Sequence, residues 1–299
     1  MDILLLFEQT LNGLQLGMML FLIAAGLTLV LGIMNFINLA HGSFYMVGAF
    51  FAATLYELTD SFVLAVPLAF VASACFGAAL EFVALRALYD RNHLDQVLGT
   101  YGLILFLAQM ARIIWGAEPY DIPVPAFLSG QVEILPDAPY PVYRLAITAV
   151  AALVGVALWY LISRTRLGML IRAGASNREM VGALGVDIRL LCTFVFGLGA
   201  ALAGLAGAMT GPILTVNITM WESILILTFV VIIIGGIGSI RGALVAALLV
   251  GLVDTLGRFL LPELFGPTTG PALSSMSIYI LMAVTLCLRP QGLFSSAHG

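Results

Sequence analysis

Residues 9–56 read QTLNGLQLGMMLFLIAAGLTLVLGIMNFINLAHGSFYMVGAFFAATLY and contain no Asp, Glu, Lys or Arg. A helix that crosses the hydrocarbon core of a bilayer needs about 20 mostly apolar residues. This run of 48 residues is therefore long enough for two crossings. It places the chain among helical membrane proteins.

The composition of the whole chain agrees with this run. Hydrophobic residues make up 62% and charged residues 9% of the 299 positions, whereas a soluble domain carries about 25% charged residues. We expect an all-α polytopic transmembrane bundle of about 8–9 spans, in a single transmembrane domain over residues 1–299. Nine segments are candidates for spans. Eight crossings are the alternative to nine, because Gly and polar residues interrupt the second, seventh and eighth segments. The candidate spans are residues 11–31, 38–56, 62–85, 97–115, 144–163, 190–211, 223–240, 243–261 and 273–288.

The chain contains no lysine, and this absence excludes several kinds of chemistry. A P-loop needs its lysine against the phosphates, and Schiff-base catalysis also needs lysine. We therefore expect no enzyme activity and no cofactor in this chain, so a partner subunit must hydrolyse ATP if ATP is used. Cys75, Cys192 and Cys287 each lie in apolar sequence and indicate small buried side chains, not a disulfide or metal set.

The arginines predict an orientation, because cytoplasmic loops carry an excess of basic residues. The segment 164–189 holds five of the twelve, so we place it in the cytoplasm. Alternating the spans then puts nine arginines inside and only Arg112, Arg144 and Arg258 outside. The N-terminus is expected outside and the C-terminus in the cytoplasm.

The inner loop 164–189 reads RTRLGMLIRAGASNREMVGALGVDIR. Ser176 followed by Glu179 matches a capping box, and Gly185 is a candidate C-cap. The pattern predicts a short helix over about 176–184 that lies along the membrane face. The positive end of its dipole, together with Arg172 and Arg178, suits acidic or carbonyl partners. An ordinary basic loop held by lipid headgroups is the alternative.

A polar cluster interrupts the first apolar run. Asn35, Asn38, His41 and Ser43 lie in a stretch without charges, and we expect a helix break near Gly32 with a restart near Asn38. Irregular backbone at membrane depth is tolerated only against protein or a water-filled cavity. These groups, with Thr100, are candidates for lining a translocation path. The alternative role of these groups is hydrogen bonding between helices. No metal site is expected at His41.

Other features carry structural expectations. The outer loop 116–143 contains six prolines and predicts a rigid cap, either a hairpin or a surface helix, with docking of an external protein as one interpretation. The glycines at 235–242 predict a second break in the helices, which is either a tight turn between two spans or part of the translocation path.

The small residues at 197–211 predict close helix packing. Asp254 and Arg258 are spaced to pair on one helix face, and Glu81 and Arg86 are expected to pair similarly.

Several segments together resemble one known family. They are GLTLVLGIMNFINLAHGSFYMVGAF (26–50), VLGTYGLIL (97–105), TRLGMLIRA (165–173), NREMVGALGVD (177–187), GLGAALAGLAGAM (197–209), IIIGGIGSIRGAL (232–244) and RPQGLF (289–294). This pattern is similar to the inner-membrane permeases of ATP-binding-cassette importers, specifically those for branched-chain amino acids. The resemblance covers essentially the whole chain.

The resemblance implies a set of partners. In that family the inner loop carries a coupling helix that sits in a groove of the ATPase, here residues 175–186. It implies two ATPase subunits, a second and commonly different permease chain, an external solute-binding protein and a bacterial inner membrane, and no nucleic acid is expected. The coupling residues would be Arg172, Ser176, Asn177, Arg178, Glu179, Gly182, Ala183 and Gly185.

Three alternatives to this function remain open at the level of sequence. The same kind of importer could carry urea, amides or small carboxylates instead of amino acids. A stand-alone ion-coupled transporter would need charged groups inside the membrane, and Asp254 is the only fair candidate. A membrane anchor without transport is disfavoured by the polar cluster at 35–43.

Overall fold

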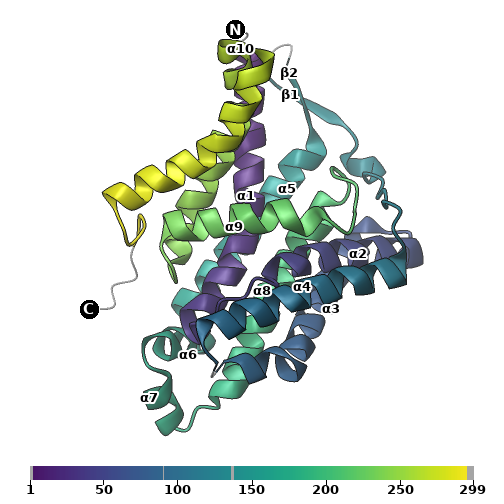
Figure 1. The fold of residues 1–299 in the computed structure, drawn as a ribbon. Helices are drawn as coiled ribbons and strands as arrows, with labels where there is room; N and C mark the ends of the chain where they lie inside the picture. Colours follow the sequence, from purple (N-terminus) through teal and green to yellow (C-terminus); the bar gives the residue numbers. More distant parts are fainter. Residues whose placement is uncertain (1–2, 90, 136–137, 295–299) are drawn as a thin grey trace. The chain divides into compact units, whose positions relative to one another are not determined.

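The computed structural model describes residues 3–89, 91–135 and 138–294 (Figure 1). Helices dominate this part of the chain, and one antiparallel hairpin accompanies them. The α-helices are α1 (Ile3–Met34), α2 (His41–Thr59), α3 (Phe62–Val83), α4 (His93–Trp115), α5 (Val142–Arg164), α6 (Arg166–Ser176), α7 (Arg178–Ala183), α8 (Ile188–Thr210), α9 (Met220–Gly235) and α10 (Ile240–Leu288). The shorter elements are η1 (Leu85–Leu88), η2 (Ala126–Leu128), β1 (Gln131–Leu135) and β2 (Ala138–Pro141).

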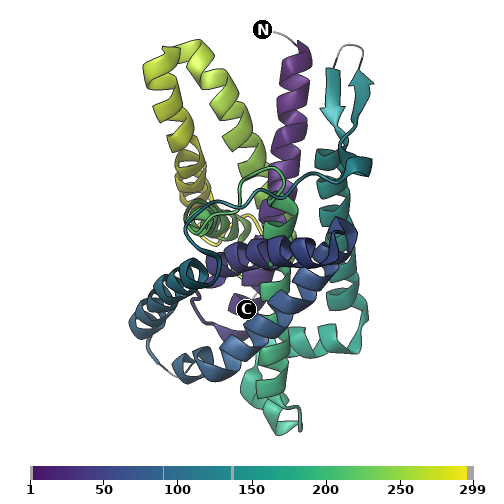
Figure 2. The same ribbon diagram turned by 90° about the vertical axis from the view of Figure 1, so that its right-hand side faces the viewer.

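All nine expected spans fall on helices, so the all-α polytopic bundle is confirmed. The last two spans are the two arms of α10, which meet at Gly266, a residue with φ of 84°. A Cβ on Gly257 would lie 3.2 Å from Oγ of Ser277, so the arms pack side by side (Figure 2). Within the described residues, six helices are long and apolar enough to cross a membrane. Whether eight or nine segments cross stays a prediction.

The chain packs as two compact units. One comprises Met1–Ala24, Val124–Val154 and Ile226–Ala297, and the other comprises Ala25–Pro123 and Gly155–Leu225. In the first unit, α1 packs on α10, where a Cβ added to Gly17 would lie 2.8 Å from Cα of Leu248. Glycine there allows the two backbones to approach closely.

The second unit is built around α8. A Cβ on Gly48 of α2 would lie 2.1 Å from Cα of Gly204, and one on Gly77 of α3 would lie 2.3 Å from Cβ of Ala200. Such contacts leave no room for a side chain, so the small residues of α8 fix how close α2 and α3 come. The prediction of close packing within the chain is therefore confirmed for α8.

Both predicted breaks are present, and the outer loop contains a hairpin. α1 continues to Met34 and α2 starts at His41, so the first break lies slightly later than expected, and Asn35 in it has a positive φ of 45°. The second break separates α9 from α10. The strands β1 and β2 pair antiparallel, which confirms the hairpin interpretation of residues 116–143.

Candidate functional site

The inner loop forms two short helices that end in ordered caps. Oγ1 of Thr165 accepts from the backbone N–H of Gly168 at 3.1 Å at the start of α6. Oδ1 of Asn177 accepts from Met180 N–H at 2.9 Å at the start of α7, and Oδ1 of Asp187 accepts from Arg189 N–H at 2.9 Å at the start of α8. Each cap satisfies a helix-terminal donor, so residues 164–189 are an ordered connection.

The predicted capping box is wrong by one residue. Ser176 is the last residue of α6, since the N–H of Asn177 still donates to Ala173 O at 2.9 Å. Asn177 then adopts an extended conformation and caps α7, which spans 178–183 instead of 176–184. Glu179 consequently sits one position too early for the reciprocal bond of a capping box. Gly185 does terminate the helix, with φ of 86° and its N–H donated to Gly182 O at 3.0 Å.

One side of α7 is exposed, and it includes apolar side chains that the sequence analysis did not single out. Met180 is 59% and Leu184 is 77% exposed, whereas Val181 is buried. The predicted coupling residues Glu179, Gly182 and Ala183 are exposed as well. The segment therefore presents a mixed polar and apolar surface of the kind that a protein groove accommodates.

Arg178 connects this loop to the first helix. Its Nε donates to the carbonyl oxygen of Ile33. The last carbonyls of a helix have no partner within the helix, and a basic side chain there also favours the negative end of the helix dipole. Arg178 is thus a C-terminal cap of α1, placed immediately before the break at residues 35–40.

Two side chains of α4 hold the backbone of that break. Ile37 N–H donates to Oε1 of Gln96 at 3.4 Å, and Leu39 N–H donates to Oγ1 of Thr100 at 3.3 Å. Nε2 of Gln96 also donates to Arg91 O at 3.1 Å. Backbone donors without a helical partner must be satisfied in another way, and these two side chains do so. Gln96 was not identified from the sequence, where it is only an isolated amide at the start of an apolar segment.

The five predicted path residues occupy different environments. Asn35 is exposed, while Asn38, His41, Ser43 and Thr100 are at most 1% exposed. The side-chain polar atoms of Asn38 and the hydroxyl of Ser43 have no hydrogen-bond partner among the described residues. Buried amides and hydroxyls without partners are costly, so this part of the break is not optimised for stability in the observed conformation.

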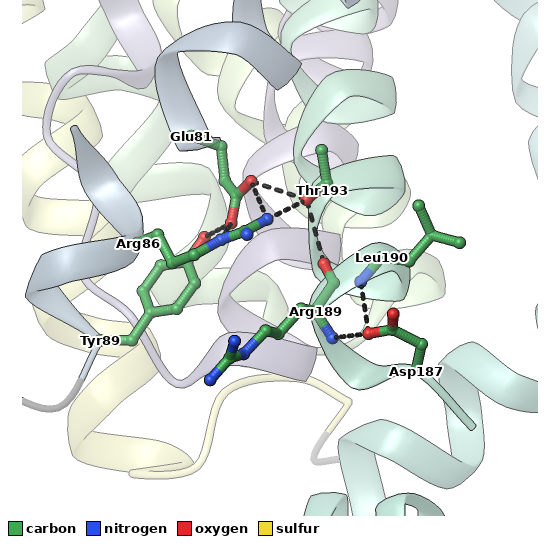
Figure 3. A network of polar contacts seen from close by, with 7 residues as sticks. All are labelled: Glu81, Arg86, Tyr89, Asp187, Arg189, Leu190 and Thr193. Carbon is green, nitrogen blue, oxygen red and sulfur yellow. Dashed lines mark hydrogen bonds and ion pairs between the residues drawn. The ribbon is translucent and has the colours of Figure 1, made fainter. Parts of the chain in front are cut away.

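A second polar network lies at the C-terminal end of α3 (Figure 3). Glu81 is completely buried and accepts from Arg86 at 3.2 Å, from the Tyr89 hydroxyl at 2.8 Å and from Thr193 of α8 at 2.7 Å. The predicted pair of Glu81 and Arg86 is confirmed. Tyr89 and Thr193 were missed, because nothing in the local pattern places α8 beside this turn.

This network also reaches the first break. The ring of Tyr89 meets the buried ring of Phe36 edge-on, with centroids 5.3 Å apart. Burial, followed by the hydrogen bond to Glu81, raises the pKa of the Tyr89 hydroxyl, so it stays a donor at physiological pH. The hydrogen bond to Glu81 likewise raises the pKa of Arg86. The inner loop therefore contacts the last turn of α1 at Ile33, and the turn between α3 and α4 contacts the break that follows at Phe36.

The predicted pair on α10 is also present. Nε of Arg258 donates to Oδ2 of Asp254 at 2.9 Å, at the expected spacing of four residues. Asp254 is 5% exposed. A buried carboxylate with a cationic partner on its own helix has a structural explanation.

Comparison with known proteins gives a consistent result. The sequence profile described as "Branched-chain amino acid transport system / permease component" matches residues 9–286. The chain is 32% identical over 302 residues to the high-affinity branched-chain amino acid transport system permease protein BraD of Pseudomonas aeruginosa, covering 96% of this chain and 94% of BraD. It is 28% identical over 298 residues to the corresponding permease protein LivH of Escherichia coli K12, covering 95% and 96% of the two chains.

A further relative matches over most of both chains. The probable branched-chain amino acid transport permease protein LivH of Methanocaldococcus jannaschii is 28% identical over 282 residues, covering 92% of this chain and 88% of that protein. No solved structure matches the chain significantly.

Proposed function

Because the chain belongs to the branched-chain amino acid transport permease family, we propose that it is a membrane subunit of an ATP-driven importer for branched-chain or related amino acids. The observation that carries this proposal is the match over residues 9–286, which takes in the inner loop, both breaks and α10. The chain is a transport component, and the proposal assigns ATP hydrolysis to partner subunits.

In this proposal α7 is the element that docks on an ATPase subunit. The exposed Met180 and Leu184 would enter an apolar groove, while Glu179 and the exposed Arg172 would meet polar groups at its rim. The ordered caps at Thr165, Asn177 and Asp187 support this role. A preorganised segment transmits displacement better than a mobile loop, since less motion is lost in reordering it.

The proposed coupling route starts at Arg178. A displacement of α7 would pull on the end of α1 through the hydrogen bond to Ile33, and so would move the break at residues 35–40. The hydrogen bonds from Ile37 and Leu39 to α4 would then be made or broken. Exposure of Asn38 and Ser43 to a water-filled path in a second conformation would supply the hydrogen-bond partners that their side chains lack among the described residues in this one.

The proposed assembly contains two ATPase subunits, a second permease chain and a solute-binding protein outside the membrane. The chain is a multi-pass membrane protein, and the proposal places it in a bacterial inner membrane with the inner loop and the C-terminus in the cytoplasm. The hairpin β1–β2 belongs to the opposite side, where it is available to the binding protein.

The test is uptake of radiolabelled leucine by the complete complex reconstituted in liposomes. We expect uptake that requires ATP on the ATPase side and the binding protein on the other, and that persists when the proton gradient is collapsed. Asp254→Asn should lower thermal stability without abolishing uptake. Uptake that needs an ion gradient and no ATP would refute the proposal and favour a secondary transporter.

A further inference from the structure

A cavity of about 390 Å³ lies where α2 approaches the connection from α8 to α9. Tyr45 lines it from the second turn of α2, Thr215 and Asn217 from the connection, and Ser223 from the first turn of α9. All of these residues belong to the second compact unit. The volume is at the lower end of the range of about 300–1,000 Å³ that is typical of small-molecule sites.

The lining combines hydroxyl and amide groups with apolar walls. The polar groups come from Thr215, Asn217, Thr219 and Ser223, and the apolar part includes Ile213 and Ile224. Hydroxyls and amides both donate and accept hydrogen bonds. They can therefore solvate an ammonium and a carboxylate in the same space.

The residues that line the cavity carry no carboxylate, guanidinium or imidazole group. A solute with a net charge would find no counter-ion among these residues, and it would lose hydration wherever it contacts the apolar wall, which is unfavourable. A zwitterion carries both charges within itself, and the apolar wall suits an aliphatic substituent. The lining thus favours a small solute without net charge that has polar and apolar ends.

Part of this lining is fixed before any solute binds. Oδ1 of Asn217 accepts from the Thr219 backbone at 3.1 Å and from the Thr219 hydroxyl at 2.9 Å, and its Nδ2 donates to Thr215 O at 3.2 Å. Asn217 thereby shapes the turn as a positioning residue. The Thr219 hydroxyl has its proton engaged and keeps its lone pairs for a donor such as an ammonium group. Val216 lies between Thr215 and Asn217 in the connection from α8 to α9. It exchanges two backbone hydrogen bonds of 2.9 Å with Tyr120, and these bonds anchor the connection.

The place of the cavity in the fold agrees with transport. The connection follows the last residue of α8, whose 23 residues span about 35 Å, and α7 precedes the first residue of the same helix. The cavity is therefore at the opposite end of α8 from the proposed ATPase contact. α2 starts directly after the break, and a Cβ on its Gly42 would lie 3.0 Å from Cβ of Leu225 in α9. A shift of α2 would change the cavity wall at Tyr45.

From this geometry we infer that the cavity is a transient binding site for the transported solute, namely a zwitterionic amino acid with an aliphatic side chain. The inference rests on the proposed function and adds a site to it. The solute would enter from the side opposite the ATPases, and the hydroxyl groups of Thr215 and Ser223 would hold its charged end.

The test is protection of introduced cysteines in the complete complex. Thr215→Cys and Ser223→Cys are each placed in a background in which Cys75, Cys192 and Cys287 are alanine, and the rate of modification by a small polar thiol reagent is measured. We expect leucine to slow the reaction at both positions several-fold, and glutamate at the same concentration to leave it unchanged. Ser129→Cys, exposed in the outer loop and outside the cavity, is the matched control and should not respond to either solute.

A second measurement covers the case in which a cysteine variant fails to assemble. Thr215→Val and Ser223→Ala remove one hydroxyl each, and each should raise the leucine concentration that half-maximally stabilises the complex against heat by about threefold to tenfold. Unchanged labelling or unchanged stabilisation in a complex that still takes up leucine overturns the site and leaves the proposed function intact. Equal protection by glutamate overturns the solute class. Failure of the unmodified complex to take up leucine contradicts the proposed function itself.

Discussion

Arg178 and Ile33 are 145 positions apart in the sequence, yet Nε of Arg178 donates a hydrogen bond to the carbonyl oxygen of Ile33. The bond joins the first residue of α7 to the last turn of α1. It is a direct physical connection between the proposed ATPase contact and the end of the helix that precedes the break.

Arg178→Ala is expected to uncouple ATP hydrolysis from transport. A hydrogen bond with a charged partner contributes about 1.5–3 kcal/mol, and a difference of about 1.4 kcal/mol corresponds to a factor of ten. Leucine uptake per ATP hydrolysed should therefore fall by about tenfold to a hundredfold, while the ATPase subunits remain bound. Arg112→Ala, at an exposed position in the last turn of α4 and outside the proposed coupling route, serves as the control and should keep a normal ratio. A normal ratio in Arg178→Ala as well would remove this bond from the coupling route.

Met180→Asp should weaken association with the ATPase subunits. Met180 is 59% exposed, so the substitution is tolerated by the free chain but places a charge in a contact that is expected to be apolar. Co-purification of the ATPase from detergent is the measurement. Met180→Leu retains the apolar contact and should co-purify normally. Full association of the Asp variant would place the ATPase contact elsewhere.

Glu81→Ala should destabilise the chain more than Thr193→Val does. Removing the carboxylate leaves Arg86, the Tyr89 hydroxyl and Thr193 without their shared acceptor. Breaking a buried ion pair costs about 3–5 kcal/mol, whereas Thr193→Val should cost about 1 kcal/mol. Thermal unfolding of the purified protein measures both. If the two variants unfold at the same temperature, Glu81 does not organise the network.

The titration of Tyr89 predicts a dependence on alkaline pH. Its pKa is raised by burial and by the bond to Glu81. The contribution of Tyr89 to stability is thus fully present below the ordinary tyrosine pKa of about 10 and declines as the pH rises above it. When the pH is raised from about 9 to about 11, the melting temperature of Tyr89→Phe should fall by less than that of the unmodified chain. An equal loss in both proteins would mean that other groups dominate the alkaline transition.

Several parts of this fold could be predicted from the sequence because their signals are local. Charge-free runs located the helices, the prolines of 116–143 indicated a rigid cap with a hairpin as one of two options, and the spacing of Asp254 and Arg258 indicated their pair. The register of the α7 cap was predicted incorrectly. Ser and Asn are almost equally good N-caps, so the choice between Ser176 and Asn177 depended on how far α6 continued.

The contacts that hold the first break could not be predicted from local pattern. Ile37 meets Gln96 across 59 positions, and Arg86 meets Thr193 across 107. Such pairs depend on which helix faces pack together, and in this chain that is set by backbone contact between small residues, as at Gly48 and Gly204. Glycine stripes indicate close packing but do not specify the partner.

The last prediction concerns whether residues 35–43 line the transport path. In this conformation Asn35 is exposed, whereas Asn38, His41 and Ser43 are buried. Cysteines at these four positions, introduced without the native cysteines, should therefore differ in reactivity towards a small polar thiol reagent. Position 35 should react with or without trapped ATP. Positions 38, 41 and 43 should react in one of the two states only, because a path that opens alternately to each side must admit water to them. If the three buried positions stay unreactive in both states, they serve packing alone. In that case Asn38→Leu should be tolerated or even stabilising, since the Asn38 amide has no partner among the described residues to leave unpaired.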